Sequence, residues 1–448
     1  MTVPAQPPSS DGGREVFGSR FGLLMTMIGV AVGLGNVWRF PYMVGKFGGA
    51  SFVAIYILAV VFLGIPALMA EWVLGRHTRL GPLGAFARAG LPLGKYVGWF
   101  FFFVVTVATG YYSNAVGWVL FHGIGEALSL LGVAHDSSAV LPPSEGLDGR
   151  SLALQLGCTA FVLLSCATVL VRGLRAGIER ASKLIMPTLL GIVMLLVVRA
   201  VTLPGAWEGV RWYLLKVDLG QINIGVVLAA LGQAFFSLSL GGTFMVVYGS
   251  YLGRQEGLRR NASWTAAGDL IAGLLAGLAI VPAVIALGME PGSGPGLLFS
   301  TLPRVFDQIP FGGFFGLLFF VGLFGAAYLS AMGALEVLVA GVVDNTSLSR
   351  TAAVWTMTAI VFALSVPPMI NMRVFVPWDL TFGSGMQTLG ALVAVIAVGW
   401  CMDRRQALRQ LQPEGVSRST VWLYHWLRFV VPVAILLVAG WWLVTSVL

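Results

Sequence analysis

The residues of this sequence that could bind a small ligand are concentrated in one short stretch, GVAVGLGNVWRFP, which covers Gly29–Pro41. The stretch lies inside an apolar run of roughly residues 21–43, which is long enough to cross a membrane as a helix. Glycines and Asn36 stand near its middle, where lipid cannot satisfy a polar group. A helix is interrupted at membrane depth only where its free backbone groups line a cavity or contact an ion. We therefore expect residues 33–36 to form an unwound binding segment; a glycine-rich helix-packing face is the alternative.

A second polar interruption lies in a later apolar run, at QAFFSLSLGG, residues 233–242. Paired interruptions at corresponding positions of two halves of a chain are typical of the substrate site of a secondary transporter. Asp269, in the following run, is an ionisable residue inside a predicted span and is therefore a functional candidate. The alternative is an acid near a helix start, favoured there by the helix dipole and reaching for water.

The composition predicts an integral membrane protein. Of the 448 residues, 57% are hydrophobic and 10% are charged, whereas soluble domains average about 25% charged residues. The net charge of +8 could indicate a nucleic-acid partner. The basic residues, however, lie in short loops between apolar runs, which is the pattern that orients a protein in a bilayer. We expect the lipid bilayer, and no nucleic acid, as a partner. The three cysteines all fall in apolar runs and have neither zinc-site nor disulfide spacing.

The elements that must position these residues are apolar runs behind a polar tail of residues 1–18. The runs lie near 19–42, 51–75, 97–128, 153–171, 183–203, 223–252, 263–289, 312–343, 351–370, 383–401 and 421–447. They predict an all-α integral membrane fold with about eleven transmembrane helices. We expect the protein in the cell (inner) membrane. Lys and Arg are concentrated in the loops on the side of the tail, so the N terminus is expected in the cytoplasm and the C terminus on the outside. Residues 297–306 have a helical pattern in an outer loop and could form a lid.

At GVAVGLGNVWRFPY the sequence resembles the neurotransmitter:sodium symporter family, which includes bacterial amino-acid transporters of the LeuT type. Further matches include Gly64-Ile65-Pro66, Glu71-Trp72, Tyr111-Tyr112, Gly177-Ile178-Glu179, Gly232–Leu240 and Ser250-Tyr251. The resemblance runs from about Arg14 to the last helix. It implies the LeuT-type fold, a 5+5 inverted repeat with broken helices 1 and 6. The implied domains are a cytoplasmic tail (1–18), a transporter core (19–401, with repeats of about 19–203 and 223–401), and a cytoplasmic loop with helix 11 (402–448).

The resemblance also implies sodium as the coupling ion, with one or two ions bound. The first site would take the carbonyl of Ala31, the side chains of Asn36 and Ser237, and Asp269. The second would take the carbonyls of Gly29, Val32 and Ala326 and the hydroxyl of Ser330. Relatives offer a further oxygen where this chain has Leu329, so occupancy of the second site stays open.

No chloride requirement is implied. Chloride-dependent relatives carry Asn where this chain has Asp269, and some chloride-independent relatives place Glu where it has Gly273. Asp269 can supply the negative charge instead.

The implied substrate site consists of residues on four helices: Ala31, Gly33, Leu34, Gly35, Ala108, Tyr112, Phe236, Ser237, Ser239, Gly242, Ser330 and Ala334. Monoamine transporters carry Asp where this chain has Gly33, so the resemblance implies a substrate with its own carboxylate, an amino acid. Leucine-selective relatives have larger groups at Ala108, Gly242 and Ala334. Because each buried methylene is worth about 0.8 kcal/mol, a bulky or aromatic hydrophobic L-amino acid is expected. Repacking of neighbouring side chains into the space is the alternative.

Two gates are implied by charge pairs. Arg39 would pair with Asp379 on the outer side; Arg14 would pair with Asp344 on the cytoplasmic side, with Phe17 and Tyr251 closing beneath. The function implied is sodium-coupled symport by alternating access, without catalytic residues. The four histidines are scattered and there is no phosphate-binding loop, which argues against an enzyme and against ATP coupling. An amino-acid sensor without net transport, and a proton-coupled transporter using Asp269, remain alternatives.

Overall fold

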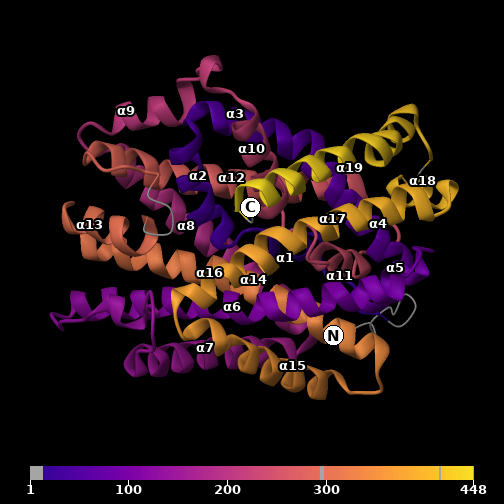
Figure 1. Cartoon of the computed structure of the whole chain (residues 1–448), viewed down its shortest axis with the longest axis horizontal. Helices are drawn as coiled ribbons and strands as arrows, with labels where there is room; N and C mark the ends of the chain where they lie inside the picture. Colours follow the sequence, from indigo (N-terminus) through magenta and orange to yellow (C-terminus); the bar gives the residue numbers. More distant parts are fainter. Residues whose placement is uncertain (1–13, 293–296, 413–414, 447–448) are drawn as a thin grey trace, which may run out of the picture.

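The computed structural model describes residues 14–292, 297–412 and 415–446. Most of the predicted tail, residues 1–13, therefore lies outside the described residues. The elements of the described part are helices, which confirms the all-α fold (Figure 1). Nine of its helices are long and apolar enough to cross a membrane, and a bent pair raises the number to ten.

The first half of the chain contains α1 to α9 and several short π-helical or 3-10 turns labelled η. Their bounds are α1 (Arg20–Ala31), η1 (Gly35–Arg39), α2 (Phe40–Phe47), α3 (Ala50–Ala59), η2 (Val60–Gly64), α4 (Ile65–Thr78), α5 (Pro82–Arg88), α6 (Gly94–Leu130), η3 (Ser137–Val140), α7 (Gly149–Leu170), η4 (Leu174–Glu179), α8 (Arg180–Val201), α9 (Ala206–Val210) and η5 (Arg211–Leu215).

The second half contains α10 to α19. Their bounds are η6 (Leu219–Gln221), α10 (Ile224–Ser237), α11 (Phe244–Ser250), α12 (Leu258–Ala286), η7 (Leu297–Thr301), α13 (Leu302–Asp307), α14 (Gly312–Asn345), α15 (Arg350–Ser365), η8 (Pro367–Met369), α16 (Met372–Trp378), η9 (Asp379–Gly385), α17 (Met386–Ile396), η10 (Ala397–Cys401), α18 (Arg404–Leu411) and α19 (Arg418–Ser446).

The first predicted span is broken, but slightly earlier than expected. α1 ends at Ala31, and the helical axis bends by 56° before it continues through η1 and α2. The prediction of unwinding over residues 33–36 was therefore right only for Gly33, since Leu34 is already helical and Gly35 and Asn36 belong to the π-helical turn η1. The reason is local: the Asn36 side chain accepts a hydrogen bond from the Gly33 N–H at 3.2 Å and so closes the start of the turn.

The sixth predicted span is also broken, between α10 and α11. Residues 238–243 are not helical, and Ser239, Gly241 and Thr243 have positive φ angles. Glu71 of α4 stabilises the break, since its Oε1 accepts a hydrogen bond from the Gly241 N–H at 2.7 Å. The two broken segments belong to spans five apart along the chain, as in the implied inverted repeat.

The tenth span begins earlier than predicted. The sequence pattern placed its start at residue 383, whereas the helical span runs from Met372 to Cys401. Arg373, Pro377 and Asp379 interrupt the apolar pattern, yet the Asn371 side chain caps the helix by accepting from the Val374 N–H.

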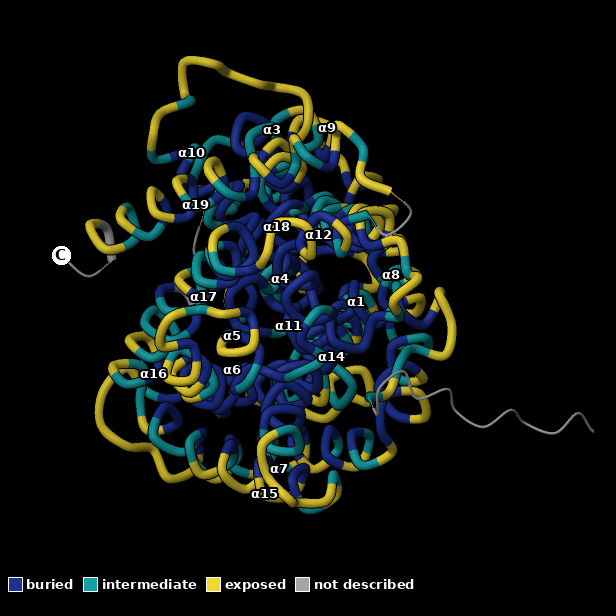
Figure 2. The backbone as a smooth tube through the Cα atoms, turned by 90° about the vertical axis from the view of Figure 1, so that its right-hand side faces the viewer, coloured by how far each residue is buried: buried dark blue, intermediate teal, exposed yellow. Residues whose placement is uncertain are grey.

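The broken helices occupy the centre of the molecule. α1 packs against α8, α12 and α14, while α6, α7 and α15 pack together at one side (Figure 1). Figure 2 shows the buried residues concentrated around α1, α4, α11 and α14, with exposed residues at the periphery. The outer helices thus carry the surface that would face lipid, and the breaks lie in the protein interior.

Candidate functional site

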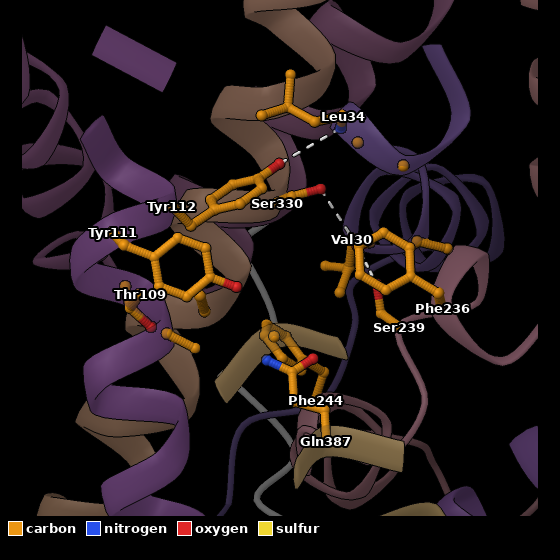
Figure 3. Close-up of a pocket in the computed structure, with 16 residues that line it drawn as sticks. Val30, Leu34, Thr109, Tyr111, Tyr112, Phe236, Ser239, Phe244, Ser330 and Gln387 are labelled. Atoms are coloured by element: carbon orange, nitrogen blue, oxygen red, sulfur yellow. Dashed lines mark hydrogen bonds between the residues drawn. The ribbon is translucent and has the colours of Figure 1, made fainter. Parts of the chain in front are cut away.

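A cavity of about 80 Å³ lies between the two helix breaks (Figure 3). Most predicted substrate-site residues line it: Ala31, Gly33, Leu34, Gly35, Ala108, Tyr112, Phe236, Ser239, Ser330 and Ala334. Ser237 and Gly242 do not. The sequence analysis also missed lining residues, namely Val30, Thr109, Tyr111, Phe244, Gly383 and Gln387.

One end of the cavity is polar and lies at the first break. The Leu34 N–H donates to the Tyr112 hydroxyl at 3.5 Å, and the Ser330 hydroxyl donates to the Val32 carbonyl at 3.1 Å. Gly33 lies directly beneath both hydroxyls, because a Cβ placed there would be 2.6 Å from Ser330 Oγ and 3.0 Å from the Tyr112 oxygen. A glycine is thus required for this close approach, and the start of η1 can present backbone N–H groups to an anion.

The other end of the cavity is formed by Phe244 and Gln387 (Figure 3). A Cβ placed on Gly242 would be 2.4 Å from the Phe244 ring and 3.4 Å from Gln387 Cδ. The Phe244 ring therefore occupies the space that the missing side chain of Gly242 leaves, so this part of the expected enlargement is filled. Ala108 and Ala334 line the cavity wall, and each contributes only a methyl group there.

Three predicted ligands of the first sodium site come together beside the cavity. The Asn36 Nδ2 donates to Asp269 Oδ1 at 2.7 Å and to Ser237 Oγ at 3.0 Å. Ser237 Oγ in turn donates to Asp269 Oδ2 at 2.5 Å and accepts from the Tyr56 hydroxyl at 3.0 Å. Asn36, Ser237 and Asp269 are all buried.

This cluster suits a small hard cation. Both carboxylate oxygens of Asp269 accept bonds from neutral groups, and a buried carboxylate without an opposite charge is costly. Hydroxyl, amide and carboxylate oxygens are the ligands that such cations prefer. Asn36 Oδ1 accepts one bond from Gly33 and retains a second lone pair. Ala31 is buried at the end of α1, next to the break.

The second predicted sodium site is only partly formed of oxygens. Ser330 and Val32 are hydrogen-bonded, as described above, and Gly29 and Ala326 are buried nearby on α1 and α14. A Cβ placed on Gly29 would, however, be 2.8 Å from Leu329 Cδ1. Leu329 is fully buried and presents a methyl group to Gly29. The atoms around the second predicted sodium site therefore fit a cation poorly where Leu329 lies.

The predicted cytoplasmic pair is present. Arg14 Nη1 lies 2.6 Å from Asp344 Oδ1, and its guanidinium lies over the Tyr251 ring, 4.8 Å from the ring centroid. The Phe17 and Tyr251 rings pack edge to face with centroids 6.5 Å apart. The four residues thus form one contact network, and its role as a gate stays a prediction.

A second ion pair joins this network through Tyr251 and was missed by the sequence analysis. Glu336, which is fully buried in α14, binds Arg350 at 2.6 Å and accepts a hydrogen bond from the Tyr251 hydroxyl at 2.5 Å. A glutamate inside a predicted span was the signal that could have identified it.

The predicted outer pair makes no direct ion pair among the described residues, although Arg39 lies close enough to act electrostatically on Asp379. Its role as a gate stays a prediction. The Arg39 guanidinium lies over the Phe236 ring, 4.3 Å from its centroid. Asp379, in η9, lies beside the Tyr111 hydroxyl, because a Cβ placed on Gly383 would be 2.0 Å from the Tyr111 oxygen and 3.2 Å from Asp379 Oδ1. Each partner therefore has a competing interaction, a cation–π contact for Arg39 and a hydroxyl for Asp379.

The outer segment of residues 297–306 is helical as predicted, as η7 and α13. Phe299 packs its ring against Trp38, Trp118 and His122, with centroid distances of 6.1, 6.3 and 4.7 Å. The segment thus covers helices that carry the site, and its role as a lid stays a prediction.

The family model described as the sodium:neurotransmitter symporter family matches residues 14–130 and 149–446. The sodium-dependent transporter YhdH of Bacillus subtilis is 34% identical over 437 residues, covering 94% of this chain and 96% of the relative. The bovine sodium-dependent dopamine transporter is 26% identical over 489 residues, covering 97% and 70%.

Among solved structures, MhsT in complex with L-phenylalanine matches with a TM-score of 0.82 and 33% identity, over 95% of this chain and 99% of that one. The match confirms the LeuT-type fold implied by the resemblance. Sequence and fold agree, and this chain belongs to the sodium:neurotransmitter symporter family, a family of sodium-dependent membrane transporters.

Proposed function

We propose that this protein imports a bulky hydrophobic L-amino acid, with aromatic side chains preferred, by sodium-coupled symport and alternating access. The observation that carries the proposal is the cavity between the two helix breaks, polar at one end and bounded by Phe244 at the other. The similar MhsT structure contains L-phenylalanine, which supports a substrate of this class.

The substrate's carboxylate is assigned to the polar end of the cavity. It would accept hydrogen bonds from the backbone N–H groups of Leu34 and Gly35 and from the Tyr112 hydroxyl, where the start of η1 favours an anion. The Gly33 N–H is held by the Asn36 side chain. The ammonium group would lie near Ser330 and the carbonyl groups at the two helix breaks, where α1 and α10 end. In this orientation the side chain of the substrate points toward Phe244.

Sodium is the co-substrate that the buried Asn36–Ser237–Asp269 cluster would hold. An ion shared with the substrate's carboxylate makes the binding of each favour the other, which is the physical basis of coupling. Asp269 would supply the negative charge, so we propose that transport needs no chloride. Gly273, one turn after Asp269 in α12, also lies beside the cluster, since a Cβ placed on it would be 3.6 Å from Asn36 Nδ2.

A binding competition tests the substrate class. We expect radiolabelled tryptophan to bind the purified protein only when sodium is present, and phenylalanine, tyrosine and tryptophan to displace it better than leucine, and leucine better than alanine. Better displacement by alanine or glycine than by tryptophan would contradict the proposed pocket.

The contact between Leu329 and Gly29 leads to a prediction about the number of sodium ions that are transported with each substrate molecule. Because a methyl group stands where an oxygen is needed, we expect one sodium ion to be coupled per cycle, with a Hill coefficient near 1. Leu329→Thr restores a hydroxyl and should raise that coefficient above 1 in sodium titrations of uptake.

Leu329→Val is the matched control, because valine has the branched shape of threonine without the hydroxyl. A Hill coefficient near 2 in the unaltered protein would contradict the proposal, and so would equal behaviour of the two variants.

We further propose the orientation and domain limits that the loop charges indicate. The N terminus and the loop from residue 402 would be cytoplasmic, the inverted repeats would cover about 19–203 and 223–401, and the C terminus after α19 would be outside. An epitope tag added after the last residue should then be accessible to antibody on intact cells, whereas a tag on the N terminus should require permeabilisation.

A further inference from the structure

One polar side chain at the far end of the cavity has no role in the site described so far. Gln387 of α17 lines the cavity, and its amide lies beside the Phe244 ring, opposite the end formed by Leu34, Tyr112 and Ser330 (Figure 3). In the part of the chain that the structure describes, no hydrogen bond joins this amide to another residue. An amide group has both donors and acceptors. Gln387 is only partly buried, so these groups stay accessible to a molecule in the cavity.

The backbone that carries Gln387 is held close to the second helix break. A Cβ on Gly241 would be 1.6 Å from the Gln387 carbonyl oxygen, and a Cβ on Gly390 would be 1.8 Å from the Gly241 carbonyl oxygen. These two glycines let α17 pack directly on the backbone of the break. The position of Gln387 relative to the substrate cavity is therefore fixed by main-chain packing.

The neighbouring polar groups already have partners. The Thr109 hydroxyl donates to the Val105 carbonyl at 2.7 Å, and Tyr111 is engaged with Asp379. The wall next to Gln387 is otherwise apolar, formed by Phe244, Ala108 and Ala334. The amide of Gln387 is thus available to hydrogen-bond a substrate side chain at this end.

We propose that Gln387 is a specificity-determining residue, which hydrogen-bonds an N–H or O–H group at the far end of the substrate's side chain. The inference rests on the proposed amino-acid transport and narrows the class of substrate. Tryptophan and tyrosine carry such a group, whereas phenylalanine would leave the amide unpaired. Among aromatic amino acids of similar size, the site therefore favours those with a polar atom on the ring.

The test compares the dissociation constants of tryptophan, tyrosine and phenylalanine in sodium for the purified protein and for Gln387→Met. Methionine keeps the unbranched shape of glutamine and removes the amide. In the unaltered protein tyrosine should bind more tightly than phenylalanine. In Gln387→Met this preference should fall about 3- to 10-fold, the effect of one hydrogen bond. Gln387→Glu, which keeps an acceptor at the same place, should retain more of the preference.

The outcomes separate this inference from the proposed function. If all three amino acids bind and the tyrosine-to-phenylalanine preference is the same in Gln387→Met, the role of Gln387 is wrong while amino-acid binding stands. If none of the three binds, the proposed substrate class itself is wrong. Should Gln387→Met fail to fold, a wild-type protein that binds phenylalanine as tightly as tyrosine would still overturn the inference.

Discussion

Replacing Asp269 with Asn is expected to make amino-acid uptake depend on chloride. In chloride-free medium uptake should fall by at least about tenfold, the effect of some 1.4 kcal/mol. The reason is that Asp269 is the buried carboxylate among the predicted sodium ligands, and its hydrogen-bond partners Asn36 and Ser237 are neutral. Without that charge the cation would lose its counter-charge, and chloride could supply it. The measurement is sodium-driven uptake with chloride or gluconate as the anion.

Glu71→Gln is the matched control for this experiment. Glu71 is also a fully buried carboxylate inside a span, but it binds the Gly241 N–H and not the sodium cluster. Whatever this change does to the rate of uptake, chloride should not restore it. Chloride-indifferent uptake by Asp269→Asn would contradict the assignment of Asp269.

The second large effect is expected from Gly241→Ala, which should weaken substrate binding strongly. Gly241 has φ +91°, a conformation that costs an L-residue roughly 1–2 kcal/mol. Its Cβ would also lie 1.6 Å from the Gln387 carbonyl oxygen, so backbone must move. Because the break and α17 both line the cavity, we expect at least a tenfold loss of tryptophan affinity together with a lower melting temperature.

Gly191→Ala is the control for the second prediction. Gly191 lies in α8 with nothing within 4 Å of an added Cβ, and alanine is the better helix former. This variant should keep its substrate affinity and should not melt earlier. Normal binding and stability of Gly241→Ala would show that the break is less constrained than the contacts indicate.

The fold and the location of the site could be predicted from the sequence because both follow from local patterns. Long apolar runs predict spans, and glycine, serine and asparagine in their middle predict breaks. The start of the tenth span could not be found in this way. Pro377 and Asp379 interrupt the apolar pattern there, and the Asn371 cap that begins the helix is a weaker signal.

The details that the sequence analysis missed depend on contacts between distant residues. Gly242 suggested an empty space, but Phe244 turns its ring into that space. Arg39 and Asp379 have opposite charges, yet no direct ion pair joins them among the described residues, and Arg39 lies over the Phe236 ring. The choice among competing partners is made by three-dimensional packing, which no spacing of residues in the sequence specifies.

The most direct test of the central claim is uptake of radiolabelled tryptophan into proteoliposomes that contain the purified protein. We predict accumulation when sodium is higher outside, no accumulation without a sodium gradient, and the same uptake when gluconate replaces chloride. Uptake driven by a proton gradient alone would contradict sodium coupling and would point to proton coupling through Asp269. Sodium-dependent binding without uptake would contradict transport and would favour a sensor.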